Sequence, residues 1–186
     1  MKTLVILSHP QLDQSVANLA MIEEYKKSSL DITIHHLEAT YSGYDIDVAA
    51  EQQLLLDADT IVLQFPFYWY SSPPALKNWL DKVLTYDFAY GSNGDKLKGK
   101  NLLLSISAGS PKEAYNALGY NHFNIFELLR PFEQTAYLTQ MRWHEPMYVY
   151  GSMYIPNISK AKESIQHNSR EHAVRVLNYL NDIVKE

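Results

Sequence analysis

Short apolar segments alternate with longer amphipathic segments along most of the chain. The apolar segments are rich in β-branched residues and have few polar positions, a pattern typical of strands that are buried on both faces. One of them, at residues 31–37, alternates weakly between apolar and polar positions. We predict strands at Thr3–Leu7, Asp31–Leu37, Thr60–Phe65, Lys100–Ser107 and Met147–Tyr150.

The segments between these strands carry apolar residues three and four positions apart, as amphipathic helices do. Good capping residues precede several of them: Ser15 before the first helix, Asp45 or Asp47 before the second and Ser72 before the third. The first predicted helix begins at Ser15. The others span Asp47–Ala58, Pro73 to about Leu84, Asn124–Glu133 and Ser159 to about Val184.

This alternation of strands and helices predicts an α/β fold, with one parallel sheet, right-handed crossovers and helices on both faces. Five strands fit the doubly wound, flavodoxin-like order 2-1-3-4-5. A chain of 186 residues suits one domain of ordinary size, spanning residues 1–186.

In sheets of this kind a ligand binds outside the carboxyl ends of the strands, at the point where the strand order reverses. That point lies between the first and third strands. Three loops meet there, at residues 8–18, 66–72 and 107–122. We therefore expect these loops to form a binding crevice.

The loop after the third strand contains four consecutive aromatic residues, from Phe67 to Tyr70. Connecting loops usually expose polar side chains, so a cluster of rings needs a reason. One interpretation is a wall against which a flat ligand lies. The alternative is that the rings pack a subunit interface or the local core.

Composition narrows the chemistry of this crevice. The chain has no cysteine, which excludes disulfides, thiolate metal sites, iron–sulfur clusters and cysteine nucleophiles, so redox chemistry needs a bound cofactor. A net charge of −5 without a basic block argues against a nucleic-acid partner. No apolar run is long enough to span a membrane and no secretory cleavage pattern follows Met1, so we expect a cytoplasmic protein without membrane insertion.

The loop after the first strand places polar side chains where the first helix begins. A helix N-terminus offers unpaired amide donors and a partial positive charge, and therefore binds phosphate. Ser15 and Asn18 could add side-chain donors, and His9 a ring donor or a positive charge. The alternatives are an ordinary N-cap for Ser15 and a partly buried imidazole for His9. No dinucleotide-binding fingerprint or P-loop motif is present.

A metal-dependent hydrolase is a further interpretation, with His9 and Asp13 holding a zinc ion that activates water. No pair of carboxylates follows His9 at close spacing. Three serines near the fourth strand could act as nucleophiles, but none stands in a G-x-S-x-G elbow. We expect no metal site and rank this interpretation last. The serines are Ser105, Ser107 and Ser110.

Taken together, the motifs resemble those of the flavodoxin-like NAD(P)H:quinone oxidoreductases, a family that includes ancillary subunits of bacterial glutathione-gated potassium efflux systems. The similarity covers nearly the whole chain, and the order and spacing of its motifs are specific. The motifs are Ser8-His9-Pro10 with Ser15 and Asn18, Ala49-Ala50-Glu51-Gln52, Pro66 with Trp69-Tyr70-Ser71, Pro73-Pro74 with Leu76-Lys77 and Trp79 to Val83, Ala89-Tyr90-Gly91, Leu97 with Gly99-Lys100, and Leu128 to Ala136.

The resemblance implies a flavin site at the predicted crevice, with the phosphate on the first loop and the ring between the other two. Its cofactor-binding residues would be His9, Ser15, Val16, Ala17, Asn18, Pro66, Phe67, Tyr68, Trp69, Tyr70, Ser107, Ala108, Gly109 and Ser110. Ser110 stands where the family commonly has a second glycine. The family's catalytic tyrosine and histidine would correspond to Tyr115 and His122, with Asn121 competing for the second role.

The activity implied by the resemblance is two-electron, ping-pong hydride transfer from NAD(P)H through FMN to quinones or similar flat electrophiles. FAD is the alternative cofactor, but the chain shows no obvious extension for its adenosine half. The resemblance also implies a homodimer. A second interpretation is a regulatory subunit that carries flavin and contacts a potassium efflux transporter on its cytoplasmic side.

Overall fold

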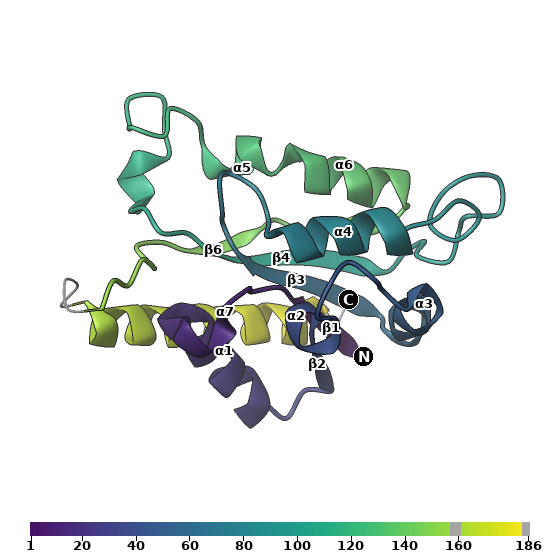
Figure 1. Cartoon of the computed structure of the whole chain (residues 1–186), viewed down its shortest axis with the longest axis horizontal. Coiled ribbons are helices and arrows are strands. Elements are labelled where there is room, and N and C mark those ends of the chain that lie inside the picture. The colour runs from purple at the N-terminus through teal and green to yellow at the C-terminus, as the bar shows by residue number, and fades with distance from the viewer. Residues whose placement is uncertain (157–160, 184–186) are drawn as a thin grey trace.

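The computed structural model describes residues 1–156 and 161–183, and its centre is a parallel sheet (Figure 1). The main path through the sheet is β2-β1-β3-β4-β5, with β6 also paired to β4. This confirms the predicted flavodoxin-like strand order. The strands are β1 (Thr3–Leu7), β2 (Ile32–His36), β3 (Thr60–Pro66), β4 (Asn101–Ser107), β5 (Arg142–Trp143) and β6 (Met147–Val149).

The fifth position of the sheet is divided between two short strands. β5 pairs with the start of β4 through Asn101 and Leu102, and β6 pairs with its end from Ser105 to Ser107. The strand predicted at Met147–Tyr150 is β6. The sequence missed β5 because a strand of two residues is too short to show a hydrophobic period.

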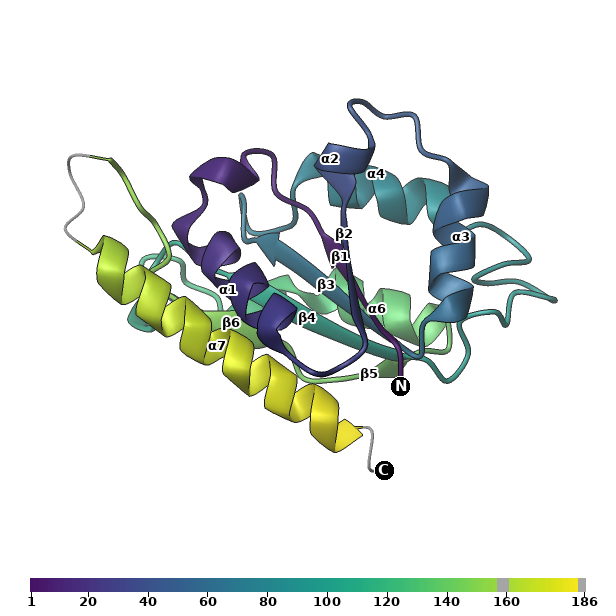
Figure 2. The ribbon, with the colours of Figure 1, turned by 90° about the horizontal axis from the view of Figure 1, so that it is seen from below.

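Helices cover both faces of the sheet. In Figures 1 and 2, α1 and α7 lie side by side on one face, and α4 and α6 lie on the other. Figure 1 shows α5 on the same face as α6. Two short 3₁₀ turns, η1 and η2, follow β1 and β4. The helical elements are η1 (Leu12–Gln14), α1 (Val16–Lys27), α2 (Leu37–Thr40), α3 (Val48–Asp57), α4 (Pro74–Val83), η2 (Lys112–Ala114), α5 (Ile125–Leu128), α6 (Arg130–Leu138) and α7 (Lys162–Ile183).

Two of the predicted helix caps are confirmed and one is wrong. Ser15 caps α1 by accepting a hydrogen bond from the Asn18 amide, and Asp47 caps α3 in the same way. Ser72 does not cap α4. Pro73 occupies that position and has no capping side chain, while Pro74 fills the first turn, where a missing amide costs little.

The helix predicted at Asn124–Glu133 is two helices. Asn124 and Glu127 form a capping box at the start of α5, and Leu129, with φ −97° and ψ 1°, is the C-cap that follows its last residue. α6 then begins at Arg130-Pro131 and continues beyond the predicted end, to Leu138. The predicted ends of the last helix, Ser159 and Val184, lie outside the described residues.

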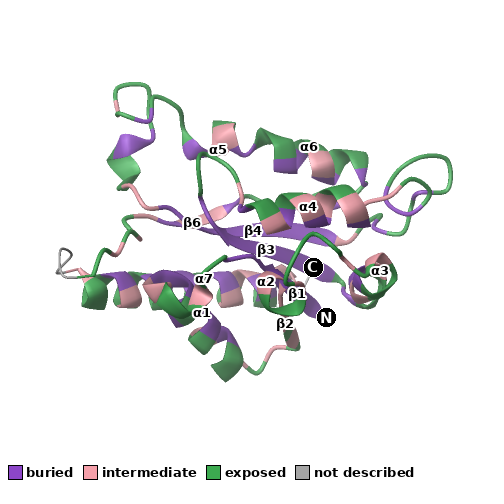
Figure 3. Cartoon of the chain, in the orientation of Figure 1, coloured by how far each residue is buried: buried purple, intermediate pink, exposed green. Residues whose placement is uncertain are grey.

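Alternate side chains of the central strands pack into two separate hydrophobic cores, one on each face of the sheet. Leu4 and Ile6 of β1 face the core under α3, α4 and α6, whereas Val5 faces the core under α1 and α7. Figure 3 shows β3 and β4 as buried along their length. In the first core, the Phe65 and Phe132 rings stack at 5.3 Å between centroids. Burial on both faces fixes the strand register, and so fixes which residues emerge at the carboxyl rim.

Glu51 is a buried carboxylate that joins α3 to its neighbours. It accepts hydrogen bonds from His35 Nε2 at 2.8 Å, Tyr41 Oη at 2.6 Å and Trp79 Nε1 at 2.7 Å. Burial by itself raises the pKa of this carboxyl, but the three hydrogen bonds together outweigh burial and hold the pKa below its usual value of 4.5. The ionised side chain therefore stabilises the contacts of α3 with β2 and α4.

We expect Glu51→Gln to destabilise the fold by roughly 2 kcal/mol at neutral pH, because an amide cannot accept from all three donors. The stabilisation is fully present above the ordinary glutamate pKa and is lost as the pH falls through the depressed value. Urea unfolding of both proteins at pH 7 and at pH 3.5 measures the difference, which should shrink in acid. Gln53→Ala, on the exposed side of α3, is the control. An equal stability of Glu51→Gln and wild type at pH 7 would contradict this role.

Candidate functional site

A cleft of about 740 Å³ opens at the carboxyl ends of β1, β3 and β4. All three predicted loops contribute to it, together with residues 152–156 and the first turns of α7. Ten of the predicted cofactor-binding residues line it: His9, Ser15, Val16, Ala17, Asn18, Pro66, Phe67, Tyr68, Ser107 and Gly109. The other four, Trp69, Tyr70, Ala108 and Ser110, do not line this cleft.

The N-terminus of α1 provides hydrogen-bond donors to the cleft. Ser15 Oγ accepts from the Asn18 amide at 3.2 Å and from Asn18 Nδ2 at 3.1 Å, so its own hydroxyl proton is available to donate. The Val16 and Ala17 amides belong to the first helical turn, where no intrahelical acceptor exists, and both residues line the cleft. This set of donors, with the helix dipole behind it, suits a phosphate group.

The Asn18 side chain has a different position from the one expected for a ligand donor. It is buried, and its Nδ2 donates to Ser107 Oγ at 3.0 Å as well as to Ser15. Its Oδ1 accepts from Gln64 Nε2 at 3.3 Å. Asn18 therefore joins α1 to β3 and β4 and fixes the floor of the cleft.

Sequence reasoning missed Gln64, although a glutamine inside an otherwise apolar strand was a visible signal. Gln64 is fully buried, and its Oε1 has no hydrogen-bond partner among the described residues. A buried amide oxygen without a partner costs free energy, so its presence below the cleft needs an explanation. Gln64 does not line the cleft, so its side chain supports the floor of the cleft through Asn18 and does not meet a ligand directly.

His9 is a neutral donor in this structure. Burial lowers the pKa of its imidazole to about 4; the charge of His36 adds to the decrease, and Asp13 opposes it. Its Nδ1 accepts from the Gln11 amide at 3.1 Å, so the ring proton is on Nε2. Of the two roles that the sequence left open for His9, these contacts favour the ring donor.

The aromatic loop forms a tight turn that exposes its rings. The amide and carbonyl groups of Tyr68 and Ser71 bond to each other at 3.0 and 2.9 Å, and the two residues between them have left-handed backbones, with φ of 46° at Trp69 and 64° at Tyr70. Such conformations are unfavourable for large side chains, and strain of this kind gathers at functional sites. Trp69 is 93% exposed, whereas Phe67 is buried at the cleft wall.

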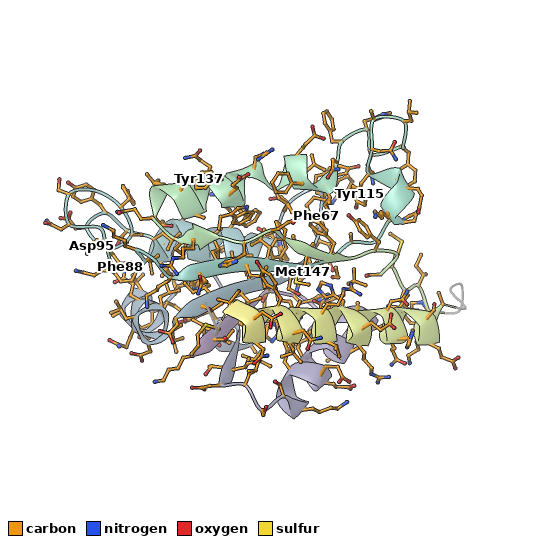
Figure 4. All side chains as sticks on the ribbon, turned by 180° about the vertical axis from the view of Figure 1, so that it is seen from behind. Phe67, Phe88, Asp95, Tyr115, Tyr137 and Met147 are labelled. Carbon is orange, nitrogen blue, oxygen red and sulfur yellow. The ribbon has the colours of Figure 1, made fainter. Side chains whose placement is uncertain are left out.

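Tyr115 lies beside this loop. Its ring is 6.1 Å from that of Phe67, and Figure 4 labels both. Burial raises the pKa of the Tyr115 phenol, which therefore keeps its proton at neutral pH; a hydrogen bond with Ser110 acts in the opposite direction. Tyr115 does not line the cleft, but it can act as a hydrogen-bond donor beside the aromatic loop.

Asn121 and His122 point to different environments. Asn121 is buried and accepts from Tyr70 Oη at 3.3 Å, while its Nδ2 has no partner among the described residues. His122 is exposed, with a left-handed φ of 60°. The turn requires Gly119, because a Cβ there would lie 2.3 Å from the Ala114 carbonyl oxygen. Asn121, rather than His122, is connected to the aromatic loop.

The residues proposed for a hydrolase do not form such a site. Ser105 is fully buried beneath α7, where its Oγ pairs with His172 Nε2 at 2.9 Å. Within residues 1–156 and 161–183, no group of three His, Asp or Glu side chains could hold a metal ion. The geometry gives no support to this third interpretation.

A family model with the description "Flavodoxin-like fold" matches residues 1–176. The chain belongs to this family. It is 47% identical over 173 residues to general stress protein 14 of Bacillus subtilis, covering 93% of this chain and 95% of that protein. It is 46% identical over 180 residues to an uncharacterized NAD(P)H oxidoreductase, YrkL, of the same organism, covering 97% and 98%.

Other relatives and solved structures extend this comparison. The ancillary protein KefG of a glutathione-regulated potassium-efflux system, from Pectobacterium atrosepticum, is 44% identical over 149 residues, covering 80% of this chain and 81% of that protein. General stress protein 14 of Treponema denticola, in complex with FMN, superposes with a TM-score of 0.86 at 37% identity, covering 98% and 99%. An NADPH-quinone reductase from P. pentosaceus superposes with a TM-score of 0.77 at 35% sequence identity, covering 93% of this chain and 98% of that protein.

The protonation state of His9 can be measured directly. We expect ¹⁵N NMR of the ring nitrogens to show a neutral imidazole protonated at Nε2 from pH 8 down to about pH 5. The pKa of His9 is about 4 in the folded protein and 6.5 in its ordinary state. Lowering the pH from 6.5 to about 4 therefore favours the unfolded chain, which binds the proton more readily. A His9 titration midpoint near 6.5 in the flavin-free protein would contradict this assignment.

Proposed function

We propose that this protein is a flavin-dependent NAD(P)H oxidoreductase, which passes two electrons from NAD(P)H through FMN to a quinone or a similar flat electrophile. One observation carries the proposal: the cleft joins a helix N-terminus with unpaired hydrogen-bond donors to an aromatic wall, at the rim where the strand order reverses. The relatives named as NAD(P)H oxidoreductases and the FMN complex support it.

The residues of the cleft fit FMN. Its phosphate would accept from the Ser15 hydroxyl, the Val16 and Ala17 amides and His9 Nε2–H, all neutral donors at one end of the cleft. Its ring would lie between Phe67 and Tyr68 on one side and Ser107 to Ser110 on the other. A cleft of about 740 Å³ also has room beside the ring for a flat substrate.

When bound, FMN would supply two-electron hydride chemistry that no side chain of this chain can perform. The protein would bind the donor and the acceptor in turn against the same face and exclude water with Phe67 and Tyr68. Tyr115, which retains its proton at neutral pH, would donate a hydrogen bond toward charge that develops on the ring. We propose Asn121 as the second donor, in place of His122, because it is the one held beside the aromatic loop.

The visible spectrum of the purified protein tests this function. We expect a yellow protein whose absorbance near 450 nm bleaches on anaerobic addition of NADPH or NADH and returns on addition of a quinone, in the pattern typical of flavin. A colourless protein that takes up neither FMN nor FAD would contradict the proposal. Binding of FAD in preference to FMN would contradict the assignment of the cofactor.

We further propose that the protein is a homodimer with the site at the subunit boundary. Large apolar side chains beside the cleft are exposed in the single chain, which is unusual unless another surface covers them. They belong to the aromatic loop and to the loop that carries Asn121. They are Tyr68, Trp69, Tyr70, Leu118, Tyr120 and Phe123.

Trp69→Ala tests whether the exposed ring stacks on a flat substrate and whether it contributes to the dimer interface. We expect about two- to tenfold higher KM for the flat substrate, the loss typical of an aromatic contact, together with weaker self-association. Steady-state kinetics and sedimentation velocity measure the two effects. Tyr44→Ala, an exposed aromatic in the loop before α3, is the matched control. A monomeric wild type would refute the dimer, and unchanged KM and flavin retention would refute the stacking role.

A second candidate function is contact with a potassium efflux transporter, as the name of the KefG relatives suggests. Among the described residues, no helix is long and apolar enough to cross a membrane. We propose that the protein is cytoplasmic and that residues 1–186 form one domain. In this second function it would act on such a transporter through protein contact. Co-purification with an efflux transporter, together with an absence of reductase turnover, would favour this second function over the first.

A further inference from the structure

A carboxylate lies behind the phosphate end of the cleft without lining it. Glu38, on the short helix α2, accepts from Ser8 Oγ at 2.8 Å through Oε1 and from the His9 amide at 3.0 Å through Oε2. Ser8 is fully buried, and its own amide continues the sheet by donating to the Gln64 carbonyl. Both oxygens of one side chain thus hold the two residues at which the chain leaves β1.

His36, the last residue of β2, completes the arrangement. Its Nε2 lies 3.2 Å from the His9 carbonyl oxygen and 3.5 Å from Glu38 Oε2. The amide and the carbonyl of His9 are therefore both engaged from the same side. With its backbone held in this way, the His9 ring has little freedom to turn out of the cleft.

Two further contacts fix the ring of His9 from the other side. Gln11 donates to its Nδ1, and the Tyr68 ring packs edge-on at 6.1 Å between centroids. Glu38 also lies close enough to Tyr68 for its charge to add to the burial that raises the pKa of that phenol. The carboxylate therefore borders both the phosphate end and the aromatic wall.

We propose that Glu38 is a positioning residue for the phosphate end of the cleft: it holds the Ser8–His9 turn so that His9 Nε2–H donates to the phosphate of the flavin. This rests on the proposed function. The role is geometric, because Glu38 touches neither the cleft nor a bound phosphate. Its negative charge opposes anion binding, so a neutral side chain that keeps the same hydrogen bonds should serve equally well or better.

Two substitutions separate position from charge. Glu38→Gln keeps an oxygen for the His9 amide and offers an amide group to Ser8 Oγ, since a hydroxyl can accept as well as donate. Glu38→Ala removes both hydrogen bonds. Glu24→Ala is the matched control, because the Glu24 side chain is 18% exposed against 19% for Glu38 and pairs with Lys27 on α1 rather than with the turn.

The measurement is the dissociation constant of flavin-free, full-length protein for FMN and for riboflavin, which lacks the phosphate. We expect Glu38→Ala to weaken FMN binding about tenfold, the loss that follows when a buried donor is left without its acceptor. Riboflavin binding should change less than about twofold, and Glu38→Gln should bind FMN at least as tightly as wild type. In a protein that already carries His9→Ala, adding Glu38→Ala should leave the dissociation constant for FMN almost unchanged.

Ser8→Ala removes only one of the two hydrogen bonds, and it replaces Glu38→Ala in the test if that variant fails to fold. It should also weaken the binding of FMN more than the binding of riboflavin. Equal weakening of FMN and riboflavin would overturn the proposal, because Glu38 would then support the fold in general. Unchanged FMN binding in both variants would overturn it as well. A wild type that binds neither flavin would refute the proposed function itself, which distinguishes the two failures.

Discussion

Parallel, in-register pairing of β1, β3 and β4 is the constraint on which the rest of the structure depends. Leu7 pairs with Gln64, and Gln64 pairs with Ser105, so the three strands end at one rim and deliver their loops to one place. The Asn18 amide then joins these ends, with hydrogen bonds to Ser107 and from Gln64. A slip of one residue in this register would turn both side chains to the opposite face and remove the floor of the cleft.

On that floor the protein arranges neutral donors in place of positive charge. His9 is held uncharged, Ser15 supplies a hydroxyl and the start of α1 supplies amides and a partial charge. Two carboxylates behind the cleft orient the scaffold: Glu38 fixes the turn after β1, and Glu51 fixes α3 against β2 and α4. Charged side chains also line the cleft, namely Asp13, Glu23 and Lys162.

Much of the fold follows from local pattern. β1 and β3 were predicted almost to the residue because both are continuous apolar runs, and α1 was placed by its cap at Ser15. The location of the cleft followed from topology alone. Other features depend on tertiary contacts that a local pattern does not carry: β5 forms only because β4 is there to pair with it, and Asn18 turns inward because Ser107 and Gln64 lie beneath it. The left-handed turn that exposes His122 and buries Asn121 depends on Gly119 packing against Ala114.

The central claim is that three loops at one rim bind a planar, phosphate-bearing redox group. A crystal structure of the protein grown with FMN tests it most directly. The account predicts the phosphate at the Ser15 hydroxyl and the Val16 and Ala17 amides, with the ring against Phe67. Density for FMN at any other surface, or a cleft filled by the protein's own side chains under saturating FMN, would contradict it.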